Sequence, residues 1–179
     1  MAHPHGGLMR TPWIGNKVPP EITWAADTGC FTRAYEHDAY FGWLATANKN
    51  TCLFATAPDV LGNWHKTLEQ SISILPQIRD AGYKAAIVLQ NGCTTVPWDE
   101  VDAVFIGGDD GFKEGWDAYG LTLEAKRRGK WVHMGRVNSW RRMFIAAKWG
   151  CDSVDGTFLA FGPDKLWPEL EVWLERLNG

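Results

Sequence analysis

Long apolar runs are missing from the 179-residue sequence. A helix that crosses a membrane needs about 20 consecutive apolar residues, and no segment of this chain approaches that length. The first residues, MAHPHGGLMR, also lack the charged start and the apolar stretch of a secretory signal. We therefore expect a cytoplasmic protein with no membrane partner.

Cysteine is scarce and widely spaced. The four cysteines stand at positions 30, 52, 93 and 151, with no CxxC pair and no neighbouring pair of His and Cys. A zinc ribbon or finger needs closely spaced Cys and His ligands, so we expect no metal site of that kind. Dispersed cysteines are typical of reduced thiols in the cytoplasm.

Excess positive charge is also absent. The chain has 18 basic and 21 acidic residues, which gives a formal net charge of −3 and a pI near 5.9. This balance argues against general electrostatic binding of nucleic acid, although not against a local basic patch. Because 45% of the residues are hydrophobic and 11 are tryptophan, we expect a large core in a single domain over residues 1–179.

The common nucleotide-binding signatures are missing, since no GxGxxG follows the first expected strand and no P-loop occurs. What is present is an alternation of short apolar runs and amphipathic stretches. Runs such as AAIVL and AVFI are apolar throughout, which is typical of strands buried on both faces of a parallel sheet. The expected strands are Leu8–Ile14, Ile22–Ala26, Thr51–Ala55, Ala85–Leu89, Ala103–Ile106, Trp131–Met134 and Ser153–Leu159.

Helical periodicity occupies the connections between these runs. The expected helices cover Trp64–Ala81, with a kink at Pro76, then Gly115–Arg128, a segment from a Ser139 cap to Lys148, and Leu166–Leu177 after an Asp164 cap. Alternating strands and helices predict an α/β fold with a parallel sheet. The pattern favours neither of two architectures: a compact TIM-type (β/α) barrel of reduced size, or an open doubly wound sheet.

Polar residues stand where the expected strands end, which is where parallel α/β folds bind their ligands. They include Asp27, Asp59, Gln90 and Arg136, together with the glycines Gly107, Gly108 and Gly135, and the last expected strand carries Asp152 and Asp155. Carboxylates can act as nucleophile or as acid and base at a sugar carbon, and an amide can bind a purine edge. Each carboxylate can equally be a helix cap or a turn former. Asp152 and Asp155 would point to opposite faces of a strand, so only one of them can face a site.

The order of these strand ends resembles that of tRNA-guanine transglycosylases. The stretch HMGRVNSWRRMFIAAKWGCDSVDGTFLAF is similar to the family's segment from a Met-Gly strand end, across one helix, to the strand with the nucleophilic aspartate. The family's Asp-Ser-Gly-Gly-Phe motif is similar to ADTGCF in this sequence. Its glutamine-bearing strand end is similar to IVLQNG, and its Gly-Gly strand end is similar to FIGGDDG. A base-reading aspartate of the family stands where this sequence has APDV. The resemblance covers about residues 22–161 and is nearest to short phage and bacterial 7-deazaguanine DNA transglycosylases.

This resemblance implies a TIM-type barrel that exchanges guanine in nucleic acid for a 7-deazaguanine base, with no cofactor and no metal. Asp155 would attack C1′ as the nucleophile, and Asp27 would be the general base. The residues that would bind the base are Asp59, Gln90, Gly107, Gly108, Met134 and Gly135.

DNA is the implied partner, because the chain carries no zinc-binding or RNA-binding segment after the barrel. Arg136, Arg141 and Arg142 would contact it, and the chain could form a homodimer. Cys30 and Thr32 depart from the family motif, which has Gly and Gln there. The sequence leaves open an N-glycosidase that releases a purine, a non-catalytic nucleobase or nucleic-acid binding module, and an open-sheet nucleotide-binding protein.

Overall fold

Seven parallel strands form one sheet in chain order, β1-β2-β3-β4-β5-β6-β7. The computed structural model describes residues 6–13 and 19–178. The strands are β1 (Gly7–Arg10), β2 (Thr23–Ala26), β3 (Cys52–Thr56), β4 (Ala85–Leu89), β5 (Ala103–Ile106), β6 (Trp131–Met134) and β7 (Ser153–Val154). Every neighbouring pair is parallel, so all strands end at the same rim.

The sheet curls strongly. The rings of Phe54 on β3 and His133 on β6 lie with their centroids 5.2 Å apart, although two strands separate β3 from β6. A flat sheet would hold β3 and β6 about 14 Å apart, because neighbouring strands are spaced by about 4.8 Å. The expected reduced TIM-type architecture is therefore confirmed as a half-barrel. The doubly wound alternative is wrong, since the strand order never reverses.

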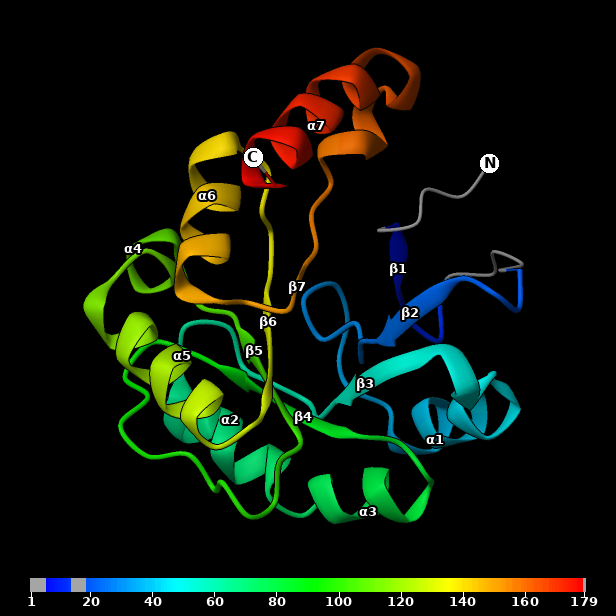
Figure 1. Cartoon of the computed structure of the whole chain (residues 1–179). Helices are drawn as coiled ribbons and strands as arrows, with labels where there is room; N and C mark the ends of the chain where they lie inside the picture. The colour runs from blue at the N-terminus through cyan, green and yellow to red at the C-terminus, as the bar shows by residue number, and fades with distance from the viewer. Residues whose placement is uncertain (1–5, 14–18, 179) are drawn as a thin grey trace.

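Helices cover the outer side of the curled sheet, and α7 packs beside α6 at one end of the molecule (Figure 1). The helices are α1 (His37–Thr46), α2 (Trp64–Ser71), α3 (Leu75–Asp80), α4 (Asp110–Lys113), α5 (Trp116–Arg127), α6 (Trp140–Trp149) and α7 (Pro163–Asn178), with 3-10 turns η1 (Lys49–Thr51) and η2 (Phe158–Phe161). Within the described ranges, every helix is too short or too polar to cross a membrane.

The core has two layers that follow the alternation of side chains along each strand. On β6, Val132 and Met134 are fully buried in the large outer layer between sheet and helices. Trp131 packs instead in a small inner layer with Phe54 and Phe105. His133 has the same parity as Trp131, so it points to the concave side of the sheet.

Several sequence-based boundaries are confirmed, including those of β4, β5 and β6. Ser139 caps α6 by accepting a hydrogen bond from the Arg142 amide, and Gly150 ends that helix in the left-handed conformation. Both features agree with the expected capping chemistry.

Other boundaries differ for local reasons. The helix expected over residues 64–81 is divided into α2 and α3, because Pro76 lacks an N–H group and occupies the first turn of a new helix. The last strand is only Ser153–Val154, since the chain turns away after Asp155. Asp164 lies inside the first turn of α7 and is not its cap. Ile14, the end of the first expected strand, lies outside the described residues.

Candidate active site

Asp27 directly follows β2 and turns its carboxyl group toward the concave side. Its Oδ1 accepts a hydrogen bond of 2.6 Å from the amide of Gly29, a residue in the left-handed conformation. Burial and the charge of Asp155 raise the pKa of Asp27, against the lowering effects of the Gly29 amide and of His133. Asp27 is therefore suited to hold a proton and to donate it.

Asp155 directly follows β7 and is tied to β6. His133 Nε2 lies 3.0 Å from Asp155 Oδ1, and His133 Nδ1 lies 2.8 Å from Ser153 Oγ. Ser153 Oγ also accepts a hydrogen bond of 2.9 Å from Trp131 Nε1. All these groups are satisfied when the Ser153 hydroxyl donates to Nδ1 and Nε2–H donates to Asp155, so the network orients an accepting carboxylate.

Asp59 lies in the segment after β3 and pairs with Gln90, which follows β4. Gln90 Nε2 donates to Asp59 Oδ2 at 2.6 Å, and Gln90 Oε1 accepts from the Gly62 amide at 2.8 Å. Burial and the charge of Asp27 raise the pKa of Asp59 to about 6. Gln90 is 1% exposed, so both ends of its amide serve the protein, and its observed role is to hold the segment that carries Asp59.

The glycines at the ends of β5 and β6 permit close packing at the rim. A Cβ at Gly107 would lie 2.6 Å from Val88 Cγ1, and one at Gly135 would lie 2.4 Å from Phe105 Cε1 and 3.2 Å from Asp155 Oδ1. Gly108 has a φ of +72°, which favours glycine. These positions let the rim pack tightly around Gln90 and Asp155.

Two cations converge on one carbonyl oxygen beside Asp155. Arg136 Nη2 and Lys113 Nζ donate to Gly108 O at 2.7 and 3.0 Å. The Arg136 amide also donates to Asp155 Oδ1 at 3.3 Å. Arg136 is exposed, whereas Lys113 is 1% exposed. The rim therefore presents a guanidinium group next to the carboxylates.

Two residues singled out in the sequence lie away from this rim, and two arginines lie beside it but are paired. Met134 is fully buried in the outer layer and faces the helices. Asp152 precedes β7, so it stands at the opposite rim, where it pairs with Lys126 at 2.6 Å. Arg141 and Arg142 both pair with Glu114, at 2.9 and 3.0 Å. The expected basic surface is thus partly neutralised by an acidic neighbour.

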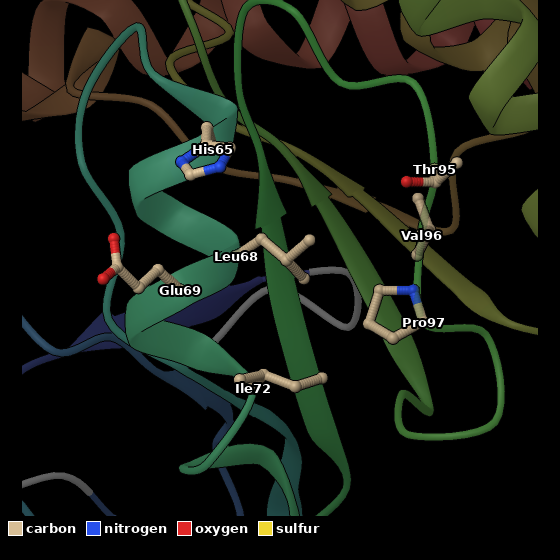
Figure 2. A pocket seen from close by; sticks show the side chains of 7 residues that line it. All are labelled: His65, Leu68, Glu69, Ile72, Thr95, Val96 and Pro97. Atoms are coloured by element: carbon tan, nitrogen blue, oxygen red, sulfur yellow. The ribbon is translucent and has the colours of Figure 1, made fainter.

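Two hollows among the described residues bear on the choice of site. One, of about 560 Å³, adjoins the rim and includes Cys30, Arg33, Tyr35, Asp59 and Gln70 among its lining residues. The other, of about 460 Å³, lies between α2 and the segment 95–97; Figure 2 shows its walls of apolar side chains with His65 and Glu69 at the edge. The second hollow contains none of the strand-end carboxylates. No three His, Cys, Asp or Glu side chains among the described residues gather as metal ligands.

Sequence reasoning missed two members of the site. His133 is not among the strand-end residues considered from the sequence, yet its two-residue spacing from Trp131 and from Gly135 places it on the same face as Gly135. Lys113 offered no comparable signal. Its position depends on the short helix α4, which turns its last residue back toward Gly108.

No protein-family model matches the sequence. No curated protein matches it either. Among solved structures, the chain is similar to the phosphodiesterase PaMucR in complex with c-di-GMP, with 15% identity and a TM-score of 0.49 over 76% of this chain. It is also similar to the EAL enzyme Bd1971 with cAMP and cyclic-di-GMP bound, with 11% identity and a TM-score of 0.47 over 76% of this chain. The matches span 60% and 39% of those chains, less than two thirds of either.

Neither structure is a transglycosylase, and the expected membership of the tRNA-guanine transglycosylases is wrong. The expected guanine exchange is therefore also wrong, as are the expected DNA and 7-deazaguanine partners. The error has a physical origin: Asp, Gln and Gly at the ends of parallel strands are what any ligand-binding (β/α) rim requires, so their order is not specific to one family.

Proposed function

We propose that this chain is a hydrolase of phosphate diesters whose acid and base are Asp27 and Asp155. The supporting observation is the approach of these two carboxyl groups from opposite sides of the curled sheet, beside the exposed guanidinium of Arg136. Because the likeness to solved structures is slight, the proposal rests on the site alone.

The charges at the rim suit a phosphate group. The Arg136 guanidinium is held by one hydrogen bond to Gly108 O, which leaves further N–H donors for the non-bridging oxygens of a phosphate. Lys113 adds a second positive charge behind it. Such fixed cations stabilise the charge that develops on the phosphoryl oxygens in the transition state.

The two carboxyl groups suit the two proton transfers of hydrolysis. Asp155, which accepts hydrogen bonds from His133 and from the Arg136 amide, would take a proton from the attacking water. The water oxygen would form a bond to phosphorus as the bond to the ester oxygen breaks. Asp27, whose pKa is raised by burial and by Asp155, would donate its proton to the departing alkoxide. The products would be an alcohol and a phosphate monoester.

The role of Asp59 is to border the substrate space. It belongs to both the rim and the hollow of about 560 Å³, so a substituent of the phosphate could extend from Arg136 across the rim into that hollow. We therefore propose a diester, with an organic group on each side of the phosphorus, as the substrate, and residues 1–179 as one catalytic domain.

The experiment that tests this proposal is a hydrolysis assay of the purified chain. The substrates are bis(4-nitrophenyl) phosphate, 4-nitrophenyl phosphate and c-di-GMP, each with EDTA and with added Mg²⁺ or Mn²⁺. We expect release of product from at least one diester and loss of at least 100-fold in kcat in Asp155→Asn. Equal rates for wild type and Asp155→Asn would contradict the assignment, as would activity on the monoester alone.

A further inference from the structure

Lys113 is a buried ammonium group that none of the proposed proton transfers uses. It ends α4 and is 1% exposed, with Nζ 3.0 Å from Gly108 O. Burying a charged group is costly unless partners compensate it. Burial and the charges of Arg136 and Arg142 lower the pKa of Lys113 to about 8, while Asp110 and Asp155 act in the opposite direction.

Arg136 is held in an unusual backbone conformation. Its φ is +57°, and it is the single non-glycine residue with positive φ in the described part of the chain. Residues other than glycine adopt this backbone conformation at a cost in free energy, and such residues cluster at functional sites. Three hydrogen bonds hold it: its amide donates to Asp155, its carbonyl accepts from Arg142 Nη1 at 2.9 Å, and its guanidinium donates to Gly108 O.

Gly108 O joins the two cations. It accepts from both Lys113 Nζ and Arg136 Nη2, and its residue is fixed by a left-handed turn in which a Cβ would lie 2.7 Å from Phe112. Asp109, the next residue, caps α4 and is bonded to Asn91 through both its amide and its carboxylate. The carbonyl that orients the Arg136 guanidinium is therefore part of a rigid turn, and Lys113 fills the space behind it.

We propose that Lys113 is a positioning residue for Arg136: by binding Gly108 O it fixes the carbonyl that holds the guanidinium over the rim. This inference rests on the proposed function, in which Arg136 binds the phosphate group. Lys113 touches no substrate, because its side chain is buried. Its effect on phosphate affinity passes through the Gly108 carbonyl and Arg136.

The variants separate this role from a general effect on folding. Lys113→Met removes the ammonium group but keeps an unbranched apolar side chain. Lys113→Gln keeps a donor that can reach Gly108 O and is the second variant if Lys113→Met does not fold. The matched control is Lys148→Met, which removes a lysine from the exposed side of α6, near Phe144.

The first measurement is the affinity for inorganic phosphate by titration calorimetry, in a double-mutant cycle with Arg136→Met. We expect phosphate binding about tenfold weaker in Lys113→Met, a partial recovery in Lys113→Gln, and no change in Lys148→Met. Because Lys113 acts through Arg136, the double variant should bind no more weakly than Arg136→Met alone. Additive losses, or an unchanged affinity in Lys113→Met, would overturn the inference.

The second measurement does not depend on phosphate. The Nε–Hε NMR signal of Arg136, assigned by its loss in Arg136→Met, reports how firmly the guanidinium is held in the free protein. We expect faster exchange of this proton in Lys113→Met than in wild type or Lys148→Met. If wild type binds no phosphate and hydrolyses no diester, the proposed function fails, and this signal alone decides the positioning role: a change supports it, and an unchanged signal overturns it.

Discussion

The carboxyl groups of Asp27 and Asp155 lie close enough for the charge of Asp155 to raise the pKa of Asp27, although they follow β2 and β7, near the opposite edges of the sheet. This proximity is a product of the curl, since a flat sheet would separate these strands by more than 20 Å. Like charges at short range cannot both be ionised without cost. Asp27, whose pKa is raised, is therefore the member of the pair that is suited to carry a proton.

Asp59 should lower the stability of the folded protein at neutral pH. Its pKa is about 6 in the folded chain, against 3.8 for the ordinary group, mainly because of burial and then of the charge of Asp27. The folded state thus binds more protons between pH 4 and pH 6, so this contribution to stability is present below pH 4 and is lost as the pH rises through 6. We expect Asp59→Asn, which can still accept from Gln90, to raise the free energy of unfolding at pH 7 by about 2 kcal/mol.

Urea denaturation at pH 4 and at pH 7 measures this effect. The gain should be small at pH 4, where Asp59 is protonated in the folded state and still partly protonated in the unfolded state. Asp99→Asn changes an exposed carboxylate and is the control, for which we expect no such pH-dependent gain. A gain of equal size at both pH values would show that the effect does not come from titration of Asp59.

Two glycine substitutions should change stability in opposite directions. Gly107→Ala places a Cβ 2.6 Å from Val88 Cγ1 and 2.9 Å from Leu89 O, so we expect a loss of about 1–3 kcal/mol. Gly120→Ala adds a methyl group on α5 with nothing within 4 Å, and we expect a gain of up to about 1 kcal/mol from helix propensity. Thermal unfolding of both variants checks this, and a Gly107→Ala protein as stable as wild type would refute the close packing of the rim.

The left-handed backbone at Arg136 should make the protein less stable than a glycine at this position would, while the arginine side chain is needed for phosphate binding. An alanine there keeps the unfavourable φ of +57°, whereas a glycine adopts it freely. We expect Arg136→Gly to be more stable than Arg136→Ala by about 1 kcal/mol, while both variants lose phosphate binding because both lack the guanidinium. The melting temperatures of the two variants give the comparison. An alanine variant at least as stable as the glycine variant would argue that this residue is not left-handed in solution.

Much of the fold could be predicted from sequence because burial on both faces leaves a clear pattern. The runs Ala85–Leu89 and Ala103–Ile106 are apolar throughout, and their boundaries agree with the structure. The apolar pattern does not decide between a barrel and an open sheet, because both bury parallel strands in the same way, and the barrel was expected only from the resemblance. That choice depends on contacts between distant strands, such as Phe54 with His133. Helix α1 was also missed.

The candidate site could be predicted in part, because strand ends in a parallel sheet meet at one rim. Asp27, Asp59, Gln90 and Asp155 are all found there. The hydrogen-bond partners of these groups could not be predicted from the sequence. Gln90 binds Asp59, and Asp155 binds His133, and in each case the two residues belong to different strands or to the segments that follow them. The chemistry was misassigned because short motifs specify where a rim is polar and not which bond it breaks.

The pH dependence of kcat/KM for a phosphate diester tests the central claim most directly. Because burial and the charge of Asp155 raise the pKa of Asp27, a general acid at that position gives the profile an alkaline decline. We expect Asp27→Asn to lose the alkaline decline and at least 10-fold in rate at neutral pH, with a smaller loss for a diester whose leaving group needs no proton, such as 4-nitrophenolate. An alkaline decline that stays unchanged in Asp27→Asn, or a rate that stays unchanged in Asp155→Asn, would contradict the assignment of acid and base.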